Sequence, residues 1–245
     1  MSRTAAMLVI GNEILSGKIT DTNTVFLARG LFEIGIELRR VVVCPDEVEV
    51  ISHDLMELKS THDLVFTSGG VGPTHDDVTI EGVAACFGRP VVRSEAVERL
   101  IQKYYDNKAT EAHLRMASMP EGAEMIRSAE APWPTVVIEN VYVLPGVPEI
   151  FRLKFTDLRK RLDDGGEFHS EAIYTQCGEG DIAELLQRIA EGVPIVMVGS
   201  YVKWGSKDYR TKITFDGKDP DAVREAADML IAALDASLIV RRGNG

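Results

Sequence analysis

Short apolar runs alternate with segments of helical periodicity along the first part of the chain. A continuous apolar run predicts a buried strand, and apolar residues three and four apart predict an amphipathic helix. The predicted strands are residues 6–10, 41–44 and 64–67. The predicted helices run from Asp21 or Asn23 through Gly30 with a stop at Gly35, over residues 47–59, and from Asp76 or Asp77 through Phe87 with a stop at Gly88. This alternation predicts an α/β fold with a parallel sheet and right-handed crossovers, and such sheets bind ligands beyond the carboxyl ends of their strands.

The remainder of the chain predicts a polar helical stretch, a pair of strands and a second, α+β unit. Residues 94–119 are polar with helical character, and residues 135–144 predict two strands joined at Glu139 and Asn140. A turn at residues 145–148 leads into a predicted helix over residues 149–162, and residues 163–166 (DDGG) predict a linker. Beyond it, the predicted elements are strands at 171–176, 195–204, 208–215 and 237–240 and helices at 181–190 and 219–234. We therefore expect two domains, residues 1–165 and 166–245.

Charge and cysteine content narrow the classes of partner. The formal net charge of −11 argues against nucleic acid and anionic membrane surfaces, because attraction to either needs clustered Lys and Arg. A small phosphorylated ligand stays compatible, because backbone dipoles or a metal ion can hold it locally. Cys44, Cys86 and Cys177 form no Cys-x-x-Cys pair, so no zinc site or disulfide framework is indicated. The first apolar run is too short for a signal peptide or a membrane helix, and we expect a cytoplasmic protein.

The clearest chemical signal is the glycine-rich segment of residues 68–79, SGGVGPTHDDVT. Gly69, Gly70 and Gly72 leave the backbone uncovered, so N–H groups can approach an anion, and the helix N-terminus that follows adds partial positive charge. Asp76 and Asp77 would repel a phosphate unless a divalent cation bridges them to it. The alternative is that both aspartates only cap the helix. The glycine turn in front of them favours the metal-bridged phosphate.

The same segment resembles the signature of the molybdopterin-binding (MoaB/Mog-like) domain family. Residues 69–79 match the pattern G-G-x-G-P-T-x-x-D-x-T, and further family motifs follow in the right order. These motifs are residues 11–15 (GNEIL) with 21–24 (DTNT), residues 45–47 (PDE) and residues 144–149 (LPGVPE). The resemblance covers nearly the whole chain and extends to a subgroup formed by the N-terminal region of competence/damage-inducible protein A (CinA) and the molybdopterin-binding-like half of FAD synthases. Residues 74–79, 140–142, 199–201 and 204–205 are more similar to the FAD-synthase version.

The resemblance implies a three-layer α/β domain, with a parallel sheet that has a mixed edge, followed by a small KH-type α+β domain. It implies two kinds of activity. Molybdenum-cofactor proteins of the family bind molybdopterin, and some adenylylate it. The CinA and FAD-synthase subgroup implies cleavage of the pyrophosphate of FAD or ADP-ribose with Mg, Mn or Co, releasing AMP. A homodimer or homotrimer is implied as well, and nothing in the residues decides between them.

The resemblance also implies site residues, position by position. Asp77 and Asp46 match the acidic residues that act in catalysis with a divalent metal. The phosphate-binding loop corresponds to Ser68, Gly69, Gly70, Gly72, Thr74 and Asp76, the polar pocket residues to Glu13 and Asn23, and a pocket wall to Pro145 and Gly146. Two departures stand out: Asn12 replaces the Asp of CinA-like sequences, which removes one candidate metal ligand, and their G-T-A-P-G segment is not recognisable near residues 131–134.

Three functional hypotheses follow. The first is a metal-dependent pyrophosphohydrolase of ADP-containing dinucleotides, in which Asp77, with Asp46, holds the ion while the N–H groups of Gly70 and Gly72 stabilise developing charge. The second is molybdopterin binding or adenylylation, and the third is a non-catalytic ligand-binding module. The motif details favour the first. Because residues 178–181 (GEGD) are acidic where a KH-type RNA-binding loop would lie, we expect no RNA binding.

Overall fold

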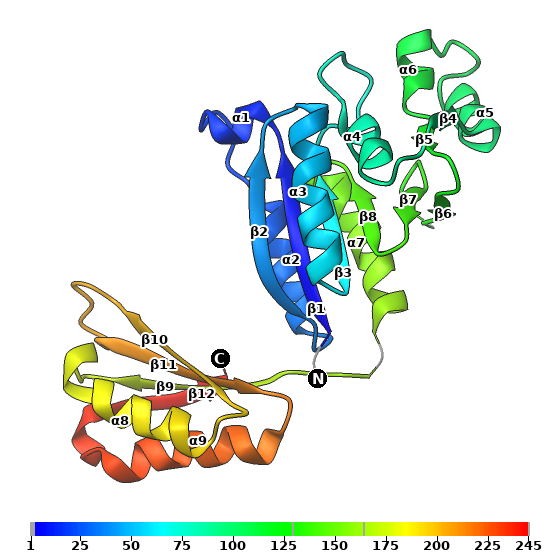
Figure 1. Cartoon of the computed structure of the whole chain (residues 1–245). Coiled ribbons are helices and arrows are strands. Elements are labelled where there is room, and N and C mark those ends of the chain that lie inside the picture. The colour runs from blue at the N-terminus through cyan, green and yellow to red at the C-terminus, as the bar shows by residue number, and fades with distance from the viewer. Residues whose placement is uncertain (1–2, 129, 164, 245) are drawn as a thin grey trace. The chain divides into compact units, whose positions relative to one another are not determined.

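The chain forms two compact units, Met1–Asp164 and Gly165–Gly245 (Figure 1). The structure, a computed structural model, describes residues 3–128, 130–163 and 165–244. Asp164 of the predicted linker lies outside the described residues. In the part of the chain that the structure describes, no helix is long and apolar enough to cross a membrane.

A six-stranded mixed sheet forms the centre of the first unit (Figure 1). In sheet order its strands are β2 (Glu37–Cys44), β1 (Thr4–Ile10), β3 (Leu64–Ser68), β8 (Val141–Leu144), β7 (Thr135–Ile138) and β6 (Glu124–Ile126). The first four are parallel to one another, whereas β7 and β6 are antiparallel to their neighbours. The predicted α/β fold with a mixed sheet edge is confirmed, and the parallel strands bring their carboxyl ends to one edge of the sheet.

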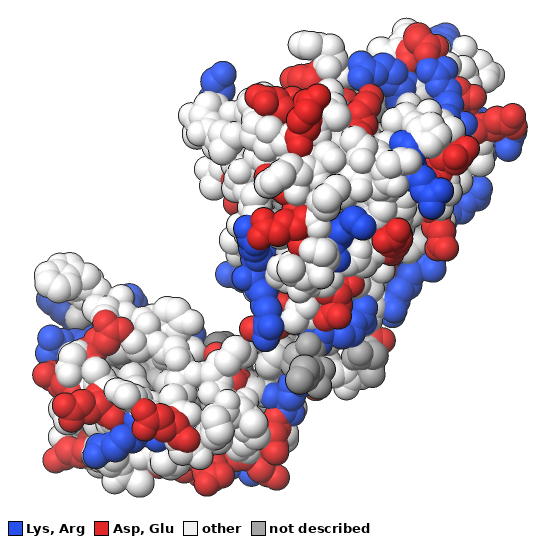
Figure 2. Space-filling model, in the orientation of Figure 1, with Lys and Arg blue, Asp and Glu red and all other residues white. Residues whose placement is uncertain are grey.

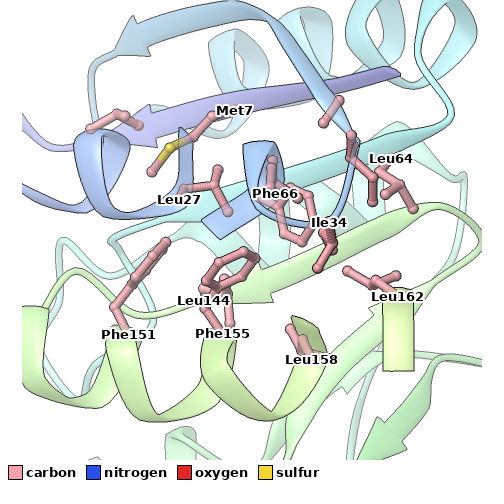
Figure 3. Close-up of a cluster of buried hydrophobic side chains, with 14 residues drawn as sticks. Met7, Leu27, Ile34, Leu64, Phe66, Leu144, Phe151, Phe155, Leu158 and Leu162 are labelled. Carbon is pink, nitrogen blue, oxygen red and sulfur yellow. The ribbon is translucent and has the colours of Figure 1, made fainter. Parts of the chain in front are cut away.

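Helices cover both faces of this sheet, which makes three layers (Figure 1). On one face lie α2 (Asn23–Phe32) and α7 (Pro148–Leu162), and on the other α3 (Val48–Thr61) and α4 (Thr79–Cys86). Side chains of β1 alternate between the two cores: Met7 points to the α2 and α7 side, with Phe66 and Phe155 (Figure 3), and Leu8 points to the other. Each buried side chain of this size contributes about 1.5–3 kcal/mol, so the two cores fix the register of the strands.

The segment between α4 and β7 departs from the expectation of one polar helical stretch. It contains β4 (Val91–Arg93), α5 (Glu95–Tyr104), α6 (Glu111–Arg115), β5 (Ser118–Pro120) and then β6. The helix breaks because Asp106 and Asn107 take positive φ values of 49° and 58°, a conformation that ends a right-handed helix. Val97, Ile101 and Ala117 form a small core of its own for this segment.

The second unit is a four-stranded antiparallel sheet with two helices on one face (Figure 1). In sheet order the strands are β10 (Met197–Val202), β11 (Thr211–Gly217), β9 (His169–Thr175) and β12 (Ile239–Asn244), and the helices are α8 (Glu179–Gly192) and α9 (Pro220–Ala233). Its core contains Ile173, Phe215 and Leu230. The α+β prediction is confirmed, although the strands expected at 195–204 and 208–215 are shorter or shifted toward the C-terminus. The remaining short elements are α1 (Asn12–Leu15) and a 3-10 turn, Ala236–Leu238.

Candidate functional site

A cavity of about 710 Å³ lies in the first unit, at the carboxyl ends of its parallel strands. The ends of β1, β3 and β8 contribute Ile10, Ser68 and Val143 to its wall, and the first turn of α4 contributes Ile80. This is the edge of the sheet where the alternation of strands and helices predicts a ligand. The predicted site residues that line the cavity are Glu13, Asn23, Ser68, Gly69, Gly70, Gly72, Asp77, Pro145 and Gly146.

The glycine loop is shaped by close contacts that other residues would block. Gly69 and Gly70 have φ values of +111° and +61°, which favour glycine. A Cβ on Gly69 would lie 2.0 Å from the carbonyl oxygen of Ile10. Thr79 holds the loop from its far end, because its Oγ1 donates to the Gly69 carbonyl at 2.9 Å and its N–H donates to the Gly70 carbonyl at 3.0 Å.

The amides of Gly70 and Gly72 are available to an anion. The N–H of Gly69 is occupied, because it donates to the Leu144 carbonyl at 3.2 Å. Among the described residues, no hydrogen bond uses the N–H groups of Gly70 or Gly72. Both glycines line the cavity, and unpaired backbone amides of such a loop can form an anion-binding concavity.

Asp77 closes the loop and lines the cavity. Its Oδ2 accepts hydrogen bonds from the N–H of Thr74, at 2.8 Å, and from the Thr74 hydroxyl. It also lies 2.7 Å from the position that a Cβ on Gly72 would occupy. The helix α4 begins at Thr79 after an N-cap at Val78, so the expectation that Asp76 or Asp77 opens this helix is wrong. The carboxylate of Asp77 folds back onto its own loop instead of capping the helix.

Asn23 joins three predicted site segments. Its side chain is 4% exposed, and its Nδ2 donates to Ser68 Oγ and to the Gly146 carbonyl, both at 2.9 Å. The carbonyl accepts only, so it fixes which end of the amide faces Gly146. Among the described residues, Asn23 Oδ1 is buried and has no hydrogen-bond partner. A buried polar atom beside a cavity is costly unless a ligand or water satisfies it.

Asp46, Thr74 and Asp76 do not line the cavity. The Asp46 carboxylate accepts the N–H of Asn12 at 2.8 Å, and so anchors the short helix α1 to the turn after β2. Nowhere in the described part of the chain do three or more His, Cys, Asp or Glu side chains gather as metal ligands. The structure therefore places Asp77, but not Asp46, in the wall of the cavity.

Sequence reasoning missed an aromatic cluster that lines the same cavity. The rings come from the segment that was expected to be polar and helical and from the loop before β7: Tyr104, Tyr105, His113 and Trp133. Arg115 lies in the wall with them, and its guanidinium donates to the Thr74 carbonyl at 3.1 Å. The aromatic segment and the glycine loop are thus linked by a hydrogen bond at the edge of the cavity.

Lys154 is a second residue that the sequence analysis missed. It lines the cavity from α7, is 6% exposed, and its Nζ donates to the Pro134 carbonyl at 2.7 Å. Burial lowers the pKa of Lys154 from 10.5 to about 8, because desolvation disfavours the charged amine. The cavity thus combines free amides, aromatic rings, a buried amine and several carboxylates, among them that of Asp77.

Comparison with known proteins identifies the family. Residues 6–163 match the family model described as a probable molybdopterin binding domain, and residues 167–243 match the middle domain of FAD synthase. A protein from Archaeoglobus fulgidus is 34% identical over 220 residues, which are 90% of this chain and 93% of that protein. A probable FAD synthase from Caenorhabditis briggsae is 32% identical over 94% of this chain, and the match spans 50% of that relative.

A solved structure supports the same assignment. The protein CinA from Thermoplasma acidophilum aligns with a TM-score of 0.62 and 31% identity, over 66% of this chain and 98% of that chain. The resemblance to CinA and to FAD synthases is confirmed by these matches. The chain therefore belongs to the molybdopterin-binding domain family, in the group related to CinA and to FAD synthases.

Proposed function

We propose that this protein hydrolyses the pyrophosphate bond of ADP-containing dinucleotides such as FAD or ADP-ribose, with a divalent metal, and releases AMP. The observation that carries the proposal is the cavity of about 710 Å³ in which two unpaired loop amides and the Asp77 carboxylate share one wall. Its volume lies within the range of small-molecule sites, roughly 300–1,000 Å³. The group's relation to FAD synthases makes an FAD-like ligand the first to test.

The loop residues supply binding and charge stabilisation in this proposal. The N–H groups of Gly70 and Gly72 bind a phosphate oxygen and stabilise the negative charge that develops on it, and one such donor contributes about 3 kcal/mol to a transition state. Asp77 keeps one carboxylate oxygen bonded to Thr74. Its second oxygen takes part in no hydrogen bond among the described residues, so it can face the ligand.

The residues present fit a metal that is bound jointly with the phosphates. Asp77 is the predicted metal ligand that lines the cavity, and the protein offers no cluster of three acidic or imidazole ligands among its described residues. Mg²⁺ is commonly held by one or two carboxylates together with substrate phosphates and waters. When bound, a divalent cation supplies charge neutralisation for the pyrophosphate and polarises the bond to be broken.

An AMP-release assay tests the proposal. The whole protein is incubated with FAD, ADP-ribose, NAD or CoA, each with Mg²⁺, Mn²⁺ or Co²⁺, and the adenylate product is measured, which is AMP for the first three and adenosine 3′,5′-bisphosphate for CoA. We expect release from at least one dinucleotide and a loss of at least about 100-fold in Asp77→Asn. Asp221→Asn, which removes an 87% exposed carboxylate of the second unit, is the matched control and should keep full activity. AMP release that survives Asp77→Asn would remove Asp77 from the mechanism.

The family match favours one alternative, a pterin-binding role. The first unit matches a molybdopterin-binding domain, and molybdopterin also combines a phosphate with a planar ring system. Tight binding of molybdopterin without AMP release from any dinucleotide would support this second function, or a non-catalytic ligand-binding module.

We also propose that the second unit, KH-type in its sequence resemblance, does not bind RNA. Gly178 donates its N–H to the Asp181 carboxylate at 3.1 Å, at the start of α8, where an RNA-binding loop would need free amides and basic neighbours. On the face shown in Figure 2, Lys and Arg side chains are mixed with Asp and Glu side chains. Tight, salt-sensitive binding to single-stranded RNA in a filter-binding or anisotropy assay would contradict this expectation.

A further inference from the structure

Four aromatic rings from separate parts of the chain gather at the cavity wall. Tyr104 ends α5, Tyr105 follows it, His113 lies in α6, and Trp133 lies in the loop before β7. The centroid of the Tyr104 ring is 5.1 Å from those of both Tyr105 and Trp133, with interplanar angles of 77° and 68°. Tyr105 stacks on His113 at 4.1 Å and 28°. These spacings are those of mutually packed aromatic rings.

The cluster is held in place by its own segment. Tyr105 and Trp133 pack on the small core that contains Val97 and Ile101. His113 forms a capping box at the start of α6, in which its Nδ1 accepts the N–H of Thr110 at 3.0 Å. A ring system fixed in this way loses little entropy when a ligand stacks on it.

The cluster has unused aromatic surface. Tyr104 takes part in two edge-to-face contacts and is still 62% exposed. All four rings line the cavity that contains the glycine loop. Aromatic side chains exposed in a ligand cavity are suited to stack on a flat heterocycle, because every such ring offers a π-face.

We propose that these four rings, the aromatic wall, bind the planar heterocycle of the ligand while the loop of residues 69–77 binds its phosphate. This inference rests on the proposed function for the presence of a phosphate on the ligand. The chemistry recognised is a flat nitrogen heterocycle, and adenine, isoalloxazine and pterin rings all present it. The hydrogen bond from Arg115 to the Thr74 carbonyl joins the aromatic wall to the glycine loop. The ring and the phosphate of a ligand are therefore bound at a fixed separation.

A single-tryptophan protein reports on the aromatic wall directly. The chain has two tryptophans, and Trp204, in the second unit, is 96% exposed. Trp204→Phe therefore leaves Trp133 as the only tryptophan fluorophore. This protein is titrated with AMP, FMN, a pterin monophosphate and ribose 5-phosphate in the presence of Mg²⁺. We expect Trp133 emission to change with at least one ring-bearing ligand and not with ribose 5-phosphate, and the ligand that binds most tightly identifies the ring.

Variants of Tyr104 in the same background separate stacking from folding. Tyr104→Ala should weaken the binding of that ring-bearing ligand about tenfold. It should leave the affinity for ribose 5-phosphate unchanged, as measured by isothermal titration calorimetry, because this ligand gives no change in Trp133 emission. Tyr104→Phe keeps the ring and should restore the affinity, which a hydroxyl-dependent role would not. Tyr201→Ala, which removes a 58% exposed tyrosine of the second unit, is the matched control.

The outcomes distinguish this inference from the proposed function. Failure of every ring-bearing ligand to bind, or equal weakening of ribose 5-phosphate by Tyr104→Ala, overturns the aromatic wall as a ring subsite. AMP release from a dinucleotide would leave the proposed function standing in that case. Conversely, ring binding that depends on Tyr104, without cleavage of any dinucleotide, keeps the subsite and refutes the hydrolase.

Discussion

Lys154 is a charged residue on the apolar face of a helix. It lies three residues after Phe151 and four before Leu158, both buried in the core under α7. The helical periodicity therefore gives Lys154 an inward position, and this spacing is the signal by which the sequence could have revealed it. A lysine there has a cost, because burial lowers its pKa from 10.5 to about 8.

The first expected outcome concerns the pH dependence of stability. Below pH 8 the folded chain carries the full cost of burying the charged amine, roughly 3 kcal/mol at most. Between pH 8 and 10.5 the folded form releases its proton while the unfolded form keeps it, so the free energy of unfolding rises with pH. In Lys154→Met this contribution is absent. The free energy of unfolding in urea is measured for parent and variant at pH 7 and pH 10. From pH 7 to pH 10 the parent should gain up to that amount of stability relative to the variant. A stability difference between the two proteins that is the same at both pH values would contradict the burial of the charge.

Asn23 gives a second expected outcome at the residue scale. In Asn23→Asp the donor group becomes an acceptor, and a carboxylate oxygen then faces the Gly146 carbonyl. We expect a loss of about 2–4 kcal/mol at pH 7, measured by urea unfolding, with partial recovery near pH 4 as the buried acid takes up a proton. A change below about 0.5 kcal/mol would mean that the amide does not hold Ser68 and Gly146 together.

The residues that sequence analysis found and missed differ in how they are encoded. Gly69, Gly70 and Asp77 lie in one continuous motif. The backbone chemistry of its glycines is enough to predict an anion-binding loop from the sequence. The aromatic wall has no such motif: Tyr104 and Trp133 are separated by a stretch that contains one helix and two strands. Only the folding of residues 91–126 brings them to one cavity, so no local spacing predicts their proximity.

At the scale of elements, the glycine loop allows a comparison of two glycines with positive φ. Gly69→Ala would combine an unfavourable φ with a Cβ placed 2.0 Å from the Ile10 carbonyl oxygen, whereas Gly88, at φ +58°, has open space around it. We expect Gly88→Ala to cost about 1 kcal/mol from backbone strain alone. Gly69→Ala should cost more than about 3 kcal/mol, because the loop or the end of β1 must move. Equal destabilisation in urea unfolding would show that the close approach is unimportant.

The predictability of the elements follows their burial. The strands β1 and β3 are almost wholly buried, so they appear in the sequence as continuous apolar runs, and both were found. All three residues of β4 are exposed, and β6 has two exposed residues of three, and neither strand has an apolar run long enough to predict a buried strand. The start of α4 was misplaced because Asp76 and Asp77 have the composition of a helix cap, whereas the backbone of residues 74–77 forms a closed turn through Thr74.

For the whole molecule, the decisive feature is that each unit has a separate core. The two large buried clusters of the first unit consist of residues that lie between positions 5 and 162. The buried cluster of the second unit consists of residues that lie between positions 173 and 230. A compact unit with its own core can in principle fold alone. The formal net charge of −11 gives the chain no long-range attraction for phosphate polymers. It is compatible with a small ligand that binds at a local anion site.

Separating the two units tests where ligand binding resides. Every residue that lines the cavity lies between Val9 and Lys154, so a fragment of residues 1–164 contains the complete site. We expect this fragment, and the fragment of residues 165–245, each to unfold cooperatively in urea. The first should bind the ring-bearing monophosphates within about threefold of the affinity of the full chain, because the loss of the second unit removes no residue from the wall. A folded first fragment that binds these ligands tenfold more weakly than the full chain would contradict this expectation. It would show that ligand binding depends on the second unit.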